Sequence, residues 1–223
     1  MAWRRSRGSL AYIVMSSLFA TLTAIFAQVK FNLGPIPYTM QNFVVILTGL
    51  VLKPKYAALS QLIYLLMIAF GVPAAANFSG GPQVLVGYTA GYLWMFPVSS
   101  FLMSYLSRLY ARRSSRSLFN PSLRDKIVLL LLSLIAVAPM YLVGFLVFCY
   151  YAVQPTALGR SLSSWSKAAA EYLGLADTEL LLVFLTTSVL VFIPQDLFVD
   201  HLLAILIAPR VLKFMRERGL EIF

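Results

Sequence analysis

The hydrophobic positions of this 223-residue chain fall into long runs, separated by short connections that are rich in charged, Gly or Pro residues. The first run, over residues 10–29, is apolar for about 20 residues, the length at which a helix crosses a hydrocarbon core of about 30 Å. The run over residues 41–52 is shorter, and it reaches that length only if residues 37–41 contribute. We therefore predict one six-helix domain over residues 1–223, with spans at 10–29, 38–52, 56–70, 85–109, 127–153 and 180–208.

Composition supports this pattern, because 60% of the residues are hydrophobic, only 12% are charged and the mean hydropathy is +0.82. A soluble domain carries charge on roughly a quarter of its residues. We predict an all-α integral membrane protein. The net charge of +10 does not indicate nucleic-acid binding, since the basic residues lie between the apolar runs. The single cysteine, Cys149, leaves no partner for an internal disulfide.

The basic residues are distributed unevenly between the two sides that six spans would define. The leader, the connection after residue 52, the connection after residue 107 and the tail together hold 15 of the 18 Lys and Arg residues. The opposite connections hold only Lys30, Arg160 and Lys167. Because cytoplasmic loops collect Lys and Arg, we predict that both the N terminus and the C terminus are cytoplasmic.

The connections on the outer side are irregular and turn-rich. Residues 30–40 contain Pro35 and Pro37, and residues 71–97 are uncharged and dense in Gly and Pro. Both residue types disfavour helix, and irregular backbone at membrane depth requires protein or a water-filled cavity around it. We predict that residues 72–91 fold into the mouth of the bundle and form one wall of a small-molecule site. The polar loop 154–177 is predicted to hold a short amphipathic helix around residues 165–173.

Three ionisable residues lie within the sixth span, namely Asp196, Asp200 and His201. Asp196 follows a break at Pro194 and lies about 21 Å from the cytoplasmic end of the helix, in the outer half of the membrane. An ionisable group at that depth marks a functional site facing the bundle interior. Asp200 and His201 admit a second interpretation, in which they form hydrogen bonds with other helices or with each other.

Three segments together resemble a known family: PIPYTMQNFVVILTGLVLKPKYAALSQLIYLL, GVPAAANFSGGPQVLVGYTAGYLWMFP and FIPQDL. They resemble BioY, the biotin-specific substrate-binding (S) component of energy-coupling-factor (ECF) transporters. The resemblance covers residues 10–110 well and the sixth span more weakly. Asn77 and Phe78 stand where the family pattern has a glycine pair, and Val199 stands where its PGDLLK motif has lysine.

The resemblance implies an ECF S-component-like bundle in the cell membrane that takes up biotin. It also implies partners, namely a transmembrane coupling (T) component and two ATP-binding subunits, because the chain has no G-x-x-x-x-G-K-[ST] loop of its own. A face of small residues, four apart on the first helix, matches the surface on which such S components dock. Its members are Ser16, Ala20 and Ala24.

Biotin combines an apolar bicyclic ring, a ureido group with two N–H donors and one carbonyl, and a carboxylate. Its site needs an acceptor, a donor and aromatic walls. We expect Asp196 to be the acceptor, an amide or hydroxyl group to be the donor, and the backbone at Gly80 to approach the ligand closely. Trp94 is expected either to form part of the aromatic wall or to lie in an interfacial belt. Lys30 or backbone amides are expected to hold the carboxylate. The substrate-binding residues expected are Gln41, Asn77, Phe78, Ser79, Gly80, Tyr88, Tyr92 and Asp196.

Two other functions fit parts of the pattern. One is an S component for another small vitamin, given the altered loop and the missing lysine. The other is an intramembrane enzyme that uses Asp196, Asp200 and His201. Against an enzyme, the sequence has no H-E-x-x-H motif, no second His and no activated nucleophile. We accordingly expect no catalytic residue, no metal site and no cofactor.

Overall fold

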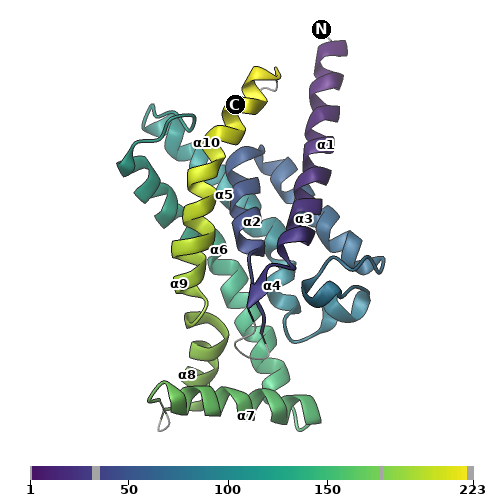
Figure 1. Cartoon of the computed structure of the whole chain (residues 1–223), viewed down its shortest axis with the longest axis vertical. Coiled ribbons are helices and arrows are strands. Elements are labelled where there is room, and N and C mark those ends of the chain that lie inside the picture. The colour runs from purple at the N-terminus through teal and green to yellow at the C-terminus, as the bar shows by residue number, and fades with distance from the viewer. Residues whose placement is uncertain (1, 32–35, 176–177, 220–223) are drawn as a thin grey trace.

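The structure, a computed structural model, describes residues 2–31, 36–175 and 178–219, with side chains from residue 10 onward (Figure 1). The side chains of the basic leader, Arg4, Arg5 and Arg7, lie outside this part. Helices dominate the described chain, which confirms the all-α class.

The helices are α1 (Ala2–Phe26), α2 (Gln41–Val51), α3 (Pro54–Ala69), α4 (Ala90–Trp94), α5 (Phe96–Arg113), α6 (Leu123–Ala152), α7 (Ala157–Tyr172), α8 (Leu180–Leu185), α9 (Ile193–Gln195) and α10 (Leu202–Glu217). Short 3-10 or π-helical segments are η1 (Ala76–Phe78), η2 (Pro82–Val86), η3 (Thr186–Leu190) and η4 (Asp196–His201). Two short strands, β1 (Lys30–Phe31) and β2 (Tyr38–Thr39), pair antiparallel, with Lys30 opposite Thr39.

The long helices run side by side along one axis, and both termini lie at the same end of the bundle (Figure 1). Helix α7 lies across the opposite end. Helix α2 is central, since ten of its eleven residues are buried and it contacts α1, α3, α5 and α10. A helix that is apolar on every side is expected in such a position. At eleven residues it extends only about 17 Å, and the chain before it forms β2 and a turn in place of further helix.

Two helical stretches are long and apolar enough to cross a membrane by length and composition. Within the described residues they are Leu123–Ala152 and Leu180–Glu217, in which an 18-residue window has a mean hydropathy of 2.5 and 1.9, respectively. The apolar helices Leu10–Phe26 and Gln41–Val51 are shorter. The structure therefore supports a membrane protein, and the count of six spans stays a prediction.

The fourth predicted span, residues 85–109, differs from the structure. Residues 85 and 86 belong to η2, and the helical part divides into α4 and α5 at Met95. Pro97 lies in the first turn of α5. Proline lacks a backbone N–H and is accepted in that turn, so the break falls just before it.

The sixth predicted span is interrupted at Pro194, as the sequence indicated. Two π-helical segments, η3 and η4, flank this proline, and the helical path then continues to Glu217. Proline removes one backbone donor from the helical ladder, and single π turns are frequent at functional sites. The π turn η4 carries Asp196 and Asp200.

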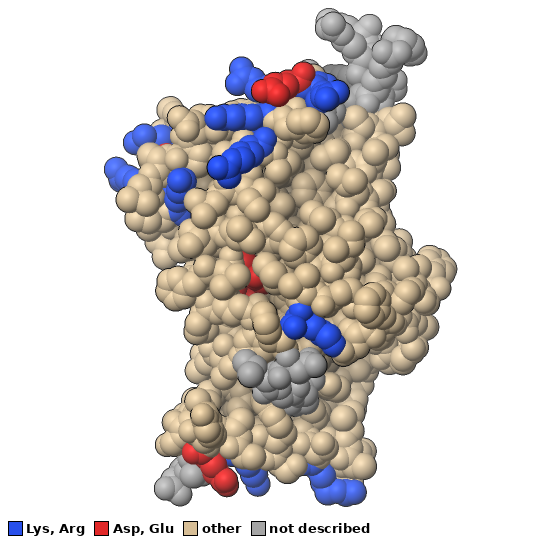
Figure 2. Space-filling model, viewed as in Figure 1, with Lys and Arg blue, Asp and Glu red and all other residues tan. Residues whose placement is uncertain are grey.

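The amphipathic helix predicted around residues 165–173 is confirmed as α7, and it begins earlier than expected. Thr156 caps it, because its hydroxyl accepts a hydrogen bond of 3.0 Å from the Gly159 N–H. Figure 2 shows Lys and Arg gathered at the end that holds the termini, whereas Arg160 and Lys167 lie on α7 at the other end.

The small-residue face of α1 packs within the chain, which corrects its assignment as a docking surface. Ser16 and Ala20 are fully buried, and the Ser16 hydroxyl donates to the Tyr56 carbonyl of α3 at 3.0 Å. Ala24 is partly buried against the same core. Small residues four apart do permit a close helix neighbour, and for this face that neighbour is α3.

Candidate functional site

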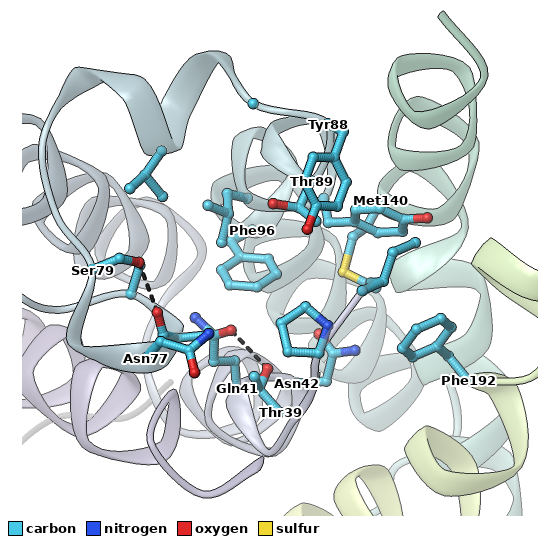
Figure 3. Close-up of a pocket in the computed structure, with 18 of the residues that line it drawn as sticks. Thr39, Gln41, Asn42, Asn77, Ser79, Tyr88, Thr89, Phe96, Met140 and Phe192 are labelled. Atoms are coloured by element: carbon cyan, nitrogen blue, oxygen red, sulfur yellow. Dashed lines mark hydrogen bonds between the residues drawn. The ribbon is translucent and has the colours of Figure 1, made fainter. Parts of the chain in front are cut away.

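A cavity of about 550 Å³ opens between the broken helix α8–α10, the loop before α4, and helices α2, α4, α5 and α6. Its volume lies within the roughly 300–1,000 Å³ of small-molecule sites. In Figure 3, Tyr88 and Thr89 face Gln41 and Asn42 across the cavity, and Phe192 closes one side.

Six of the eight predicted residues line this cavity, and the loop over residues 72–91 forms one of its walls as expected. The six are Gln41, Asn77, Ser79, Tyr88, Tyr92 and Asp196. Phe78 and Gly80 do not line it. A side chain at Gly80 would overlap the backbone of Val72, so the close approach at this glycine joins the loop to its own start.

The ring of Phe78 points away from the cavity and is 71% exposed. Asn77 and Phe78 both adopt positive φ, 61° and 53°, the region that glycine enters without steric cost. The two residues at this position thus adopt a backbone conformation that favours glycine while carrying side chains. Gln28, just after the end of α1, stabilises this turn. Its side chain accepts a hydrogen bond from the Phe78 N–H at 3.0 Å and donates one to the Ala75 carbonyl at 2.9 Å.

Replacing Phe78 by Gly is therefore expected to raise the thermal unfolding temperature and leave the cavity intact. Positive φ costs a non-glycine residue about 1–3 kcal/mol, and glycine removes most of that strain. The check is thermal unfolding of the detergent-solubilised chain. Phe78→Ala is the matched control, because it removes the ring but keeps the Cβ that causes the strain. An equal gain in both variants would contradict the explanation.

Asp196 lies at the deep end of the cavity and is 4% exposed. The Asn42 amide nitrogen donates to Asp196 Oδ2 at 2.7 Å, and the Tyr141 hydroxyl donates to the same oxygen. Hydrogen bonds to an ionised group are roughly twice as strong as neutral ones. The carboxyl group of Asp200, four residues further along η4, interacts with that of Asp196. Asp196 nevertheless lines the cavity and Asp200 does not, so Asp196 presents the acceptor to a ligand. Asn42 Oδ1, also buried, has no partner in the described part of the chain.

Two of the other predicted donors already form hydrogen bonds within the protein. The Gln41 amide nitrogen donates to the Tyr64 hydroxyl, and Gln41 Oε1 accepts from Thr39 at 2.7 Å. The Ser79 hydroxyl donates to the Ala76 carbonyl at 2.7 Å. Within the described chain, the Asn77 side chain has no hydrogen bond, which leaves its amide for a ligand.

Aromatic residues close the cavity on several sides. The Tyr92 hydroxyl donates to the Ser188 carbonyl at 2.6 Å, which ties α4 to the broken helix. Phe192 stacks on Tyr38 with ring centroids 4.2 Å apart, and the Tyr38 hydroxyl donates to the Val191 carbonyl at 2.9 Å. The cavity-lining residues that the predicted set did not contain include Asn42, Thr89, Phe96, Met140, Tyr141 and Phe192.

Three residues considered from the sequence lie outside the cavity. Trp94 is part-exposed and donates its indole N–H to the Leu85 carbonyl at 2.9 Å. Lys30 pairs with Thr39 in the short β-ladder and does not line the cavity. Val199, at the position of the family lysine, does not line it either.

His201 and Asp200 are fully buried beside the cavity and do not line it. His201 Nδ1 lies 2.9 Å from the Ser133 hydroxyl of α6, which confirms for His201 the interpretation of a hydrogen bond between helices. No group of three metal-ligating side chains occurs among the described residues.

A model of the BioY family matches residues 4–217. A probable biotin transporter BioY of Pyrococcus horikoshii is 46% identical over 90 residues, which are 40% of this chain and 56% of that protein. The biotin transporter BioY of Thermotoga maritima is 41% identical over 95 residues, 43% of this chain and 56% of that protein. The matches thus span just over half the length of these relatives.

The fold is similar to the crystal structure of the S-component for biotin from an ECF-type ABC transporter. The TM-score is 0.67 at 20% sequence identity, and the superposition covers 92% of both chains. At this identity the likeness concerns the fold.

Proposed function

The chain belongs to the BioY family, and from this premise we propose that it is the biotin-binding S component of an ECF-type vitamin uptake transporter. It captures biotin from the outer side of the cell membrane with high affinity and releases it inward when an ATPase module drives the cycle. It is a binding subunit and not an enzyme, and two of the three residues that an enzyme would need lie outside the cavity.

One observation supports this function above the others, namely the buried polar group formed by Asp196 and Asn42 at the deep end of the cavity. Asn42 Oδ1 is a buried acceptor without a partner in the described part of the chain, and the Asn42 amide nitrogen donates to the carboxylate of Asp196, which lines the cavity beside it. The ureido group of biotin is part of a ring and carries one N–H on each side of its carbonyl, so one N–H of the ligand can donate to this deep acceptor group. Buried polar groups that pair with a ligand supply specificity. Tyr88, Tyr92, Phe96 and Phe192 supply aromatic surface for the bicyclic ring.

The proposed arrangement in the membrane has six spans with both termini in the cytoplasm. Its support is the gathering of Lys and Arg at the end that holds the termini (Figure 2). The cavity then opens toward the outer side, where α7 lies. Two ATP-binding subunits on the cytoplasmic side supply the ATP hydrolysis for which this chain has no phosphate-binding loop, and a transmembrane T component couples them to it.

Calorimetry on the purified chain in detergent tests the proposal, with riboflavin and thiamine as control ligands. We expect biotin to bind with a dissociation constant well below a micromolar, and the two controls not to bind. Tight binding of a control ligand with no binding of biotin would replace biotin by another vitamin and overturn the proposal.

A further inference from the structure

The cavity contains one charged side chain among the residues that the structure describes, and that charge is negative. Asp196 is the ionisable acid in its lining, and no Lys, Arg or His contributes to the described lining. Lys30 lies opposite Thr39, a residue of the lining, in the β-ladder but does not itself line the cavity, and Arg160 and Lys167 lie on α7. The neighbouring segment 32–35, outside the described residues, contains no basic residue in its sequence.

The position of the family lysine does not supply the missing cation. Val199 is 46% exposed on the outer surface of the broken helix and does not line the cavity. Asp196 lies three residues earlier on the same helical turn with its carboxylate inside the bundle. A longer side chain at position 199 would therefore begin on the surface and not at the cavity wall.

The polar groups of the cavity differ in their burial, from buried at the deep end to exposed at the rim. Asp196 and Asn42 are deep and offer acceptors. Asn77 and Gln83 are exposed and also line the cavity, so they mark its opening. A ligand whose ring donors reach Asp196 consequently extends its acyl chain toward neutral amides and water. An ionised carboxylate deeper in the cavity would meet the charge of Asp196 without a compensating cation, which is unfavourable in a low dielectric.

We propose that this site recognises the ureido-bearing ring and makes no charge contact with the acyl end, so that carboxyl-modified forms of biotin are also ligands. The ligand class comprises biotin and its neutral amides, including biotin joined through an amide to the side chain of lysine. This inference rests on the proposed function, since it names the ligand range of the same cavity. Amide groups at the rim can donate to a carboxylate or to an amide carbonyl equally well.

Calorimetry with biotin, its primary amide and N-biotinyl-lysine tests the inference on the full chain in detergent. We expect the three dissociation constants to agree within about threefold, which corresponds to less than one kcal/mol at 1.4 kcal/mol per tenfold. We also expect biotin affinity to change little between low and high salt, because no exposed ion pair is screened. Riboflavin serves as the unrelated control ligand.

Two variants sharpen the result. Lys30→Ala is expected to leave biotin affinity unchanged, and Val199→Lys is expected not to favour biotin over its amide. The inference is overturned if the amides bind 100-fold or more weakly than biotin, or if Lys30→Ala removes a preference for the acid. In both of those outcomes biotin still binds and the proposed function stands. Absence of binding by all three ligands would instead overturn the proposed function, and this inference with it.

Discussion

Substitution of Asp196 by Asn is expected to weaken biotin binding by roughly 100-fold or more while the bundle remains folded. A hydrogen bond to a charged group contributes about 1.5–3 kcal/mol, and an unpaired buried donor adds a further cost. One hundredfold corresponds to about 3 kcal/mol at 1.4 kcal/mol per tenfold.

The effect is large because the existing hydrogen bonds decide how the new amide is oriented. Asn42 and Tyr141 both donate to Oδ2 of Asp196. An asparagine at position 196 that keeps both of these hydrogen bonds turns its carbonyl oxygen toward the two donors. Its NH₂ group then takes the place of Oδ1, where it meets the N–H groups of the ligand as donor against donor.

Asp200→Asn is the matched control for this experiment. It makes the same isosteric change one turn further along η4, at a carboxylate that does not line the cavity. Because the two carboxyl groups interact, Asp200→Asn is expected to cost some affinity by calorimetry, but clearly less than Asp196→Asn, since Asp200 does not line the cavity. Equal losses in both variants would show that Asp196 is not the specific acceptor.

The sequence was sufficient to identify those parts of the site in which a polar residue or an irregular segment interrupts an apolar run. Asp196 stood out as an ionisable residue within an apolar run after Pro194, and the uncharged loop stood out by its glycines and prolines. Both line the cavity in the structure. These signals are local, since each depends on a few neighbouring residues and on the cost of polar groups in lipid.

The remaining residues could not be identified in this way, because helix rotation and helix pairing depend on the whole bundle. Met140 and Tyr141 lie within a run of about 27 apolar residues, and hydrophobicity does not distinguish the face that meets a cavity from the face that meets lipid. For Ser16 and Ala20 on α1, the sequence likewise does not say which neighbour their face meets. Their spacing requires a close neighbour, and only the packed structure shows that α3 takes that place.

Gly144 illustrates a second kind of hidden residue, one that shapes the cavity without lining it. It is buried on α6, three residues after Tyr141, where a Cβ would overlap the ring of Tyr92 on α4. The Tyr92 ring lines the cavity and is held at its far end by the Ser188 carbonyl. The absence of a side chain at position 144 therefore sets how far this ring lies from the cavity centre.

Gly144→Ala is accordingly expected to push the Tyr92 ring out of place and to reduce biotin affinity by roughly 10- to 100-fold. Overpacking of a dense interior costs about 1–3 kcal/mol, and here the displaced atoms form the wall of the site. Isothermal calorimetry measures the affinity, and thermal unfolding shows whether the variant is folded.

A double-mutant cycle with Tyr92→Leu separates this mechanism from a general loss of packing. The smaller side chain loses part of the wall but has no ring for the new Cβ to overlap. Adding Gly144→Ala to Tyr92→Leu is then expected to cost much less affinity than adding it to the unmodified chain. Residues in contact show such non-additivity of about 0.5–3 kcal/mol. Strictly additive losses would mean that Gly144 acts on the site through some contact other than Tyr92.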